Sequence, residues 1–133
     1  SKPLYRTYVF FVHMITGNIL QQCHNEGFQE EEIYGAYKIF FGTLVSESRL
    51  RVINLLRKGK KNVSEITADL NIDQTVISHD LARLKKCGFV RTEIQGKYRY
   101  YTLNKETIEL LMQLIDDHMK QYCIHILQGM KHE

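Results

Sequence analysis

Apolar residues recur every three or four positions in the middle of this chain, the spacing of a helix with one buried face. The pattern predicts a helix over residues 63–70, in which Ala68 and Leu70 pack inward. A turn over residues 71–73 follows, and a second helix begins after its cap Asp73 and stops at Gly88. The residues expected to face the core in this second helix are Val76 or Ile77, Leu81 and Leu84.

The opposite face of this second helix is polar and carries hydrogen-bond donors, acceptors and cations. Its members are Gln74, Thr75, Ser78, His79, Arg83 and Lys86. A helix with such a face can lie in the major groove of DNA, where side chains near its N-terminus reach base edges. The pattern therefore favours DNA reading by this helix.

The next stretch changes from helical spacing to alternation. Residues 90–94 and 98–102 alternate and are rich in β-branched and aromatic residues, which predicts two strands. Gln95 and Gly96 are expected to form a two-residue turn between them, with the glycine at positive φ. The cations placed to reach phosphates or a minor groove from the hairpin tip are Lys97 and Arg99. Two short helices followed by a basic hairpin form a winged helix.

Helical spacing also predicts four flanking helices. One covers residues 4 to about 25, one starts near Gln29, and one runs from its cap Ser46 to Lys58. The helix that starts near Gln29 is expected to point six residues inward, namely Ile33, Tyr34, Tyr37, Phe40, Phe41 and Leu44. The last helix is expected to follow Asn104 and to reach about residue 128.

The last helix carries apolar residues in alternating steps of four and three, which is a heptad-like seam. The seam consists of Ile108, Met112, Ile115, Met119, Tyr122 and Ile126. Such a stripe is expected to pack against a second copy of the chain.

Six stretches of the chain together resemble a known family. They are YKIFFGTL (37–44), SESRLRVINLL (46–56), VSEI (63–66), TVISHDLARL (75–84), GFV (88–90) and KYRYYTL (97–103). Over about residues 36–104 the chain resembles the ArsR/SmtB-type winged helix-turn-helix repressors. The resemblance implies a mostly α fold with a β wing, in one domain over residues 1–133. It also implies dimerisation helices in residues 1–35 and 105–133 on either side of the 36–104 core.

The same resemblance implies a homodimer that binds a palindromic operator in double-stranded DNA and represses transcription. The residues expected to contact DNA are Gln74, Thr75, Ser78, His79, Arg83, Arg91, Lys97 and Arg99. Specificity is expected from Gln74, Thr75, Ser78 and His79. Affinity for phosphates is expected from Arg91, Lys97 and Arg99, together with the Lys58–Lys61 cluster. A winged helix can also serve as a protein-interaction module, but it would then need an acidic or apolar recognition face.

Charge and composition agree with DNA binding. The chain has 133 residues, 44% of them hydrophobic, which is enough for one domain with a core. Its net charge is only +3, yet residues 47–101 hold twelve Lys or Arg against six Asp or Glu. A basic middle between mildly acidic ends is typical of a nucleic-acid-binding module.

Composition and motifs also bear on catalysis and location. The sequence holds no Gly-rich phosphate loop, no nucleophile elbow and no His-Glu-x-x-His motif, so no enzyme activity is expected. No segment reaches the ~18 apolar residues of a membrane span. Three scattered cysteines favour a reducing compartment, and we expect a cytoplasmic protein without a membrane partner.

The chemistry of an inducer is left open by the sequence. Some members of the family bind zinc-type ions between C-terminal helices, and Asp116, His118 and His132 match three of four ligand positions, but Gly129 occupies the fourth. Some switch by thiol oxidation, for which Cys23 and Cys123 are the candidates. The simpler interpretation of the Asp and His residues is a solvated helix face. The simpler interpretation of the cysteines is packing as small buried hydrophobes. We expect no cofactor, with an effector-responsive sensor as the alternative.

Overall fold

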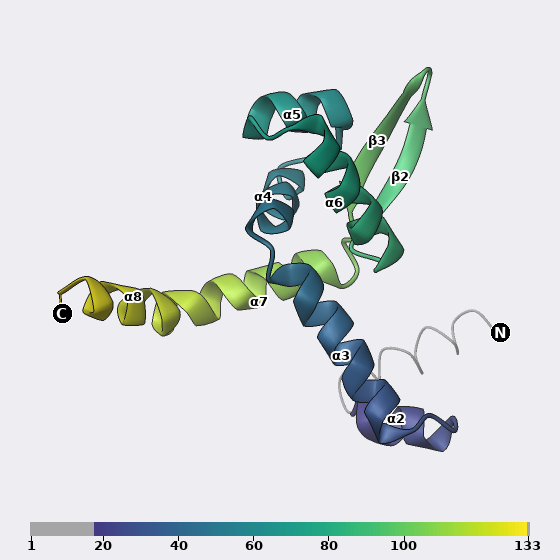
Figure 1. The fold of residues 1–133 in the computed structure, drawn as a ribbon, viewed down its shortest axis with the longest axis vertical. Helices are drawn as coiled ribbons and strands as arrows, with labels where there is room; N and C mark the ends of the chain where they lie inside the picture. Colours follow the sequence, from purple (N-terminus) through teal and green to yellow (C-terminus); the bar gives the residue numbers. More distant parts are fainter. Residues whose placement is uncertain (1–17, 133) are drawn as a thin grey trace. The chain divides into compact units, whose positions relative to one another are not determined.

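The structure, a computed structural model, describes residues 18–132. The chain divides into two compact units, Ser1–Gly42 and Thr43–Glu133 (Figure 1). The prediction of one domain over residues 1–133, with internal boundaries after residues 35 and 104, stays a prediction.

The described part of unit 1 consists of α2 (Ile19–Asn25) and most of α3 (Glu30–Leu44). Asn18 has an extended backbone, and its side chain caps α2 by accepting a hydrogen bond from the Leu20 amide over 2.8 Å. The prediction of one continuous helix over residues 4–25 is therefore wrong at Asn18, and residues 4–17 lie outside the described part. The helix ends at Asn25 as predicted, and Gly27 follows with φ of +92°.

Helix α3 begins with three glutamates in its first turn, as predicted. The six residues expected to point inward behave differently from one another. Ile33 is buried, Phe40 and Leu44 are half-buried, and Tyr34, Tyr37 and Phe41 are exposed. Neighbouring aromatic rings contact each other along the helix, with ring centroids 5.3 Å apart for Phe40 and Phe41. Among the residues that the structure describes, much of this apolar face is exposed.

Unit 2 is built around three helices, α4 (Glu47–Leu56), α5 (Val63–Leu70) and α6 (Gln74–Lys86), which Figure 1 shows grouped beside the sheet. Their inward residues form one apolar core together with residues of the strands and the next helix. Its members are Val52, Ile53, Leu56, Ile66, Ile77, Leu81, Leu84, Phe89, Val90, Leu103, Ile108 and Met112. Burial of these side chains is the main favourable term that holds the helices in place.

The buried faces of these helices are close to those predicted. In α6 it is Ile77 that is buried, whereas Val76 is 42% exposed. In α5 the prediction for Ala68 is wrong, because it is exposed and Ile66 is the fully buried residue. Ser46 caps α4 as predicted, accepting from the Arg49 amide.

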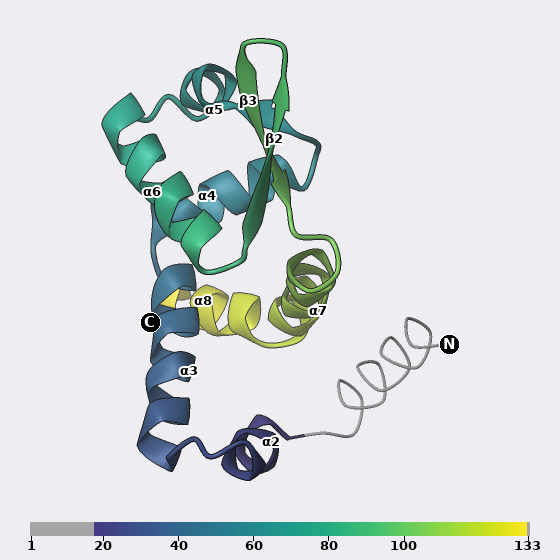
Figure 2. The ribbon, with the colours of Figure 1, turned by 90° about the vertical axis from the view of Figure 1, so that its right-hand side faces the viewer.

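A three-stranded antiparallel sheet with the order β1-β3-β2 completes the core of unit 2. Figure 2 shows its hairpin strands β2 and β3 side by side. β1 (Lys61–Asn62) was not anticipated from the sequence, and it pairs with β3 (Tyr98–Leu103). β2 (Val90–Gln95) pairs with β3 in a register that sets Gln95 opposite Tyr98. The turn is therefore Gly96-Lys97 and not Gln95-Gly96, although the positive φ of Gly96 (+63°) is as predicted.

Two helices follow the sheet, and not one. α7 (Ile108–Gln121) and α8 (Cys123–His132) meet at Tyr122, whose backbone leaves the helical region at φ −126° and ψ −70°. The prediction of a single helix from residue 105 to 128 is wrong at this residue. The predicted seam is also divided, because Ile108 and Met112 are buried inside unit 2 whereas Tyr122 and Ile126 are exposed.

Candidate nucleic-acid interface

The turn between α5 and α6 is fixed at both ends by backbone geometry. Asn71 ends α5 in the left-handed region at φ +52°. Asp73 begins α6, and its carboxylate accepts a hydrogen bond from the Thr75 amide over 2.9 Å. A left-handed residue followed two positions later by a cap leaves the turn few alternatives. The direction of α6 relative to α5 is thereby determined, as in a helix-turn-helix.

Helix α5 is itself held by a reciprocal capping box. The Glu65 amide donates to Asn62 Oδ1 over 2.9 Å, and the Asn62 amide donates to Glu65 Oε1 over 3.1 Å. Sequence reasoning missed this feature, although an Asn followed three positions later by a Glu is its signal. Asn62 is also the last residue of β1, so the start of α5 is attached to the sheet.

The outer face of α6 matches the predicted polar row. All six of its members, Gln74, Thr75, Ser78, His79, Arg83 and Lys86, are exposed. Ile77, Leu81 and Leu84 lie beneath them, each at most 1% exposed. Gly88, at φ +77°, follows the end of the helix as predicted. The helix therefore presents its polar side chains from a firmly packed base.

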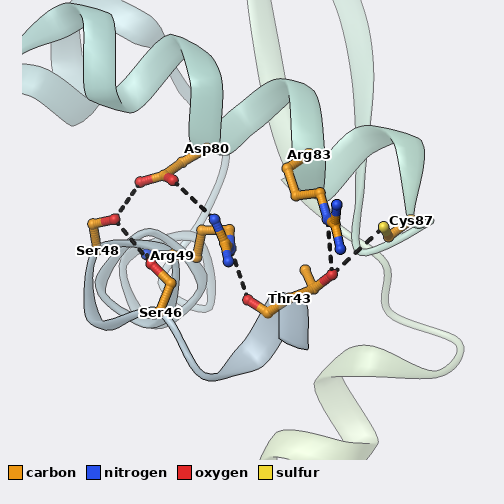
Figure 3. Close-up of polar contacts among 7 residues, drawn as sticks. All are labelled: Thr43, Ser46, Ser48, Arg49, Asp80, Arg83 and Cys87. Atoms are coloured by element: carbon orange, nitrogen blue, oxygen red, sulfur yellow. Dashed lines mark hydrogen bonds and ion pairs between the residues drawn. The ribbon is translucent and has the colours of Figure 1, made fainter. Parts of the chain in front are cut away.

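One polar residue of α6 points the other way. Asp80 is 5% exposed, and its carboxylate accepts hydrogen bonds from Ser48 and Arg49 at the start of α4 (Figure 3). Sequence reasoning missed this contact, because Asp80 lies between His79 and Leu81 and periodicity alone does not reveal its partners.

Arg83, on the exposed face of α6, is hydrogen-bonded to Thr43. Its Nε donates to Thr43 Oγ1 over 3.1 Å, and Thr43 Oγ1 donates to Cys87 Sγ over 3.6 Å (Figure 3). Arg83 remains exposed despite this contact. One edge of its guanidinium is therefore fixed to the protein, while the side chain still borders solvent.

The three cations of the hairpin differ in the contacts that they make. Lys97 lies over the ring of Tyr98, with Nζ 5.6 Å from the centroid, and Arg99 is exposed. Arg91 is paired with Glu106 over 3.3 Å, in a contact whose two side chains are both exposed. Exposed pairs of this kind are weak, so Arg91 can exchange this partner for a phosphate at little cost.

The lysine cluster at the end of α4 is partly engaged. Lys60 pairs with Glu93 over 2.8 Å, and Lys61 pairs with Asp69 over 2.7 Å. The hydrogen bond that Lys61 donates to the Asp69 carboxylate raises the pKa of Lys61 above its ordinary value, so this lysine is charged at neutral pH. Lys58 is exposed. A role for this cluster in phosphate binding stays a prediction.

Two of the predicted metal ligands, Asp116 and His118, contact other side chains of unit 2. Asp116 is engaged by Arg57, whose Nη2 lies 2.6 Å from its Oδ2, and the ring centroid of His118 lies 4.7 Å from that of Tyr122. Cys23, Cys87 and Cys123 are free cysteines. Metal binding by Asp116, His118 and His132, and thiol switching by Cys23 and Cys123, stay predictions.

Comparisons with known proteins agree with this geometry. The family model for the bacterial regulatory proteins of the arsR family matches residues 46–92. The transcriptional activator HlyU of Vibrio cholerae is 25% identical over 85 residues, which cover 64% of this chain and 76% of that protein. An uncharacterized HTH-type transcriptional regulator of Methanocaldococcus jannaschii is 31% identical over 71 residues, covering 53% and 80% respectively.

A solved structure shares the fold. The homodimeric winged helix-turn-helix DNA-binding domain of a possible ArsR-family regulator from Mycobacterium bovis superposes with a TM-score of 0.65 at 22% identity, covering 71% of this chain and 87% of that one. Within residues 18–132, every helix is too short or too polar to cross a membrane. The match over α4–β2, the relatives and the shared architecture lead to one conclusion: the chain belongs to the arsR family and is a winged helix-turn-helix transcriptional regulator.

Proposed function

We propose that this protein binds double-stranded DNA as a homodimer and represses transcription by occupying a palindromic operator. The observation that carries the proposal is the exposed polar row of α6 above a fully buried apolar base. This arrangement suits insertion of the helix into a major groove. Two copies related by a two-fold axis would present two such helices to the two halves of the operator.

Each part of the surface has its own task in this proposal. Gln74, Thr75, Ser78 and His79 lie in the first two turns of α6, where side chains of a helix-turn-helix reach base edges. Arg83, Arg91, Lys97 and Arg99 would bind phosphates and supply most of the salt-dependent affinity. Repression would follow from competition with transcription initiation at the same site.

Homodimer formation is supported by apolar side chains that are exposed among the described residues of unit 2. On α7 and α8 the exposed large residues are Leu110, Leu114, Met119, Tyr122, Ile124, Ile126, Leu127 and Met130. Many exposed large apolar side chains on two consecutive helices favour an interaction site. The face of α3 that carries Tyr37 and Phe41 has the same character.

Substitution of Gln74 tests whether α6 recognises the base sequence of the operator. An operator is first selected from random DNA with the wild type, and Gln74→Ala is then compared with wild type on operator and random duplexes. Loss of a side chain that contacts a base should cost ~1–3 kcal/mol on the operator and relax preference at one base pair. Asn54→Ala, at an exposed amide residue on α4, is the control and should leave both affinities unchanged.

Two results would contradict the proposal. Equal weakening of Gln74→Ala on operator and random DNA would show that this residue only binds the backbone. A wild type that enriches no duplex from the random pool would point instead to a protein-interaction module.

A further inference from the structure

Asp80 is a charged residue on the inner side of the DNA-reading helix. Its side chain is 8% exposed, and it lies on the helix face that also carries Ile77 and Leu84. A buried carboxylate is costly unless it is paired and hydrogen-bonded. Ser48 Oγ donates to Asp80 Oδ2 over 2.5 Å, and Arg49 Nη1 lies 3.5 Å from Asp80 Oδ1, so both oxygens have a partner.

These partners are themselves held in place. Ser48 Oγ lies 3.1 Å from the hydroxyl of Ser46, the residue that caps α4. Arg49 spans two elements, because its Nε donates to the Thr43 carbonyl over 2.7 Å while its Nη1 reaches Asp80 (Figure 3). Hydrogen bonds, which are directional, therefore connect the start of α4 to the middle of α6.

Directional contacts do something here that apolar packing does not. Hydrophobic burial is non-directional, so Ile77, Leu81 and Leu84 hold α6 against the core but tolerate a small rotation about the helix axis. Hydrogen bonds weaken steeply when their angles change. Ser78 and His79 immediately precede Asp80, so a rotation of the helix at Asp80 would move both side chains relative to a bound base pair.

We propose that Asp80 is a positioning residue for sequence reading: held by Ser48 and Arg49, its carboxylate fixes the rotation of α6 and so aims Ser78 and His79 at the bases. The inference rests on the proposed function of α6. Asp80 does not touch DNA in this account. It acts through the helix that carries the contacting side chains.

Loss of the Asp80 contacts should affect specific and non-specific DNA binding differently. Base contacts depend on the exact aim of a side chain, whereas phosphate contacts tolerate small shifts. A helix freed from Asp80 should therefore lose affinity for the operator and keep affinity for random DNA. A purely structural role would instead lower the folded fraction and weaken both kinds of binding equally.

The experiment measures dissociation constants on operator and random duplexes at one fixed salt concentration. The specificity ratio is the dissociation constant on random DNA divided by that on the operator. Asp80→Ala should reduce this ratio ~10-fold or more, while affinity for random DNA changes less than ~3-fold. Asp80→Asn should restore the ratio to within ~3-fold of wild type, because its amide can accept from Arg49 and donate to Ser48. Glu47→Gln is the control, since this acid lies in the same turn of α4 but pairs with Arg51 in solvent.

Circular dichroism and thermal unfolding establish the folded fraction of each variant. An unchanged ratio in Asp80→Ala, or equal weakening on both duplexes, would overturn the inference. If Asp80→Ala does not fold, Ser48→Ala removes one of the two partners and should lower the ratio ~3-fold, and an unchanged ratio there would also overturn it. A wild type with no preference for any duplex would overturn the proposed function itself.

Discussion

The exposed side of α7 offers the sharpest test of assembly. Leu114 lies near the middle of this helix and is 67% exposed, close to Leu110 on the same face at 54%. Because Leu114 makes few contacts within its own chain, Leu114→Glu should leave the single chain folded. It should nevertheless break a dimer in which two copies of α7 and α8 bury these residues.

The size of the effect follows from the exposed fraction. Complete burial of a leucine side chain is worth ~1.5–3 kcal/mol, and two thirds of that remains to be gained on association, or ~1–2 kcal/mol. A symmetric dimer contains the residue twice, which gives ~2–4 kcal/mol, and desolvation of two carboxylates adds to the loss. At 1.4 kcal/mol for each factor of ten, the dimer should dissociate ~30- to 1,000-fold more readily.

Sedimentation over a range of concentrations measures this change directly. Ile94→Glu is the matched control, because Ile94 is 71% exposed but lies on the hairpin, so its dimer should remain. A Leu114→Glu variant that dimerises as tightly as wild type would refute this choice of interface. A wild type that sediments as a 15.7 kDa monomer at micromolar concentration would refute the homodimer.

Two further predictions concern the hairpin and the core. Lys97→Ala and Arg99→Ala should weaken binding to every sequence alike and lower the slope of log K against log salt by about one each; an unchanged slope would remove both residues from the interface. Ile77→Ala should lower the free energy of unfolding by ~2–5 kcal/mol in urea titrations, because Ile77 is fully buried. The neighbouring Val76→Ala, at a site 42% exposed, should cost clearly less, and an equal loss would contradict the assignment of the buried face.

Local patterns were sufficient to predict the helix-turn-helix and the hairpin. Helical spacing located the buried face of α6 to within one residue, and it could not choose between Val76 and Ile77 because both are apolar and adjacent. The cap at Asp73 and the positive φ of Gly96 follow from residue type alone, and the structure confirms both. These features depend on neighbours in the sequence, which is why the sequence reveals them.

Features that depend on distant residues escaped prediction. β1 has two residues, too few to show alternation, and it exists because β3 lies beside it. The partners of Asp80 precede it by more than thirty positions, at Ser48 and Arg49. The break at Tyr122 carries neither glycine nor proline to mark it, so spacing alone extended the helix through it.

The double role of Asn62 has a consequence for how the protein would tolerate operators of different length. This one residue ends β1, which is paired with the hairpin strand β3, and it also caps α5, which leads into α6. Hairpin and helix-turn-helix are thus joined at a shared residue without an intervening linker, and they should move as one body. An operator with an added base pair between its halves cannot be accommodated by shifting the hairpin against the helix within one chain. Such an operator could be bound only if the DNA bends or if the contact between the two copies changes. The flexibility of the DNA and of the dimer contact therefore determines which half-site spacings the protein tolerates.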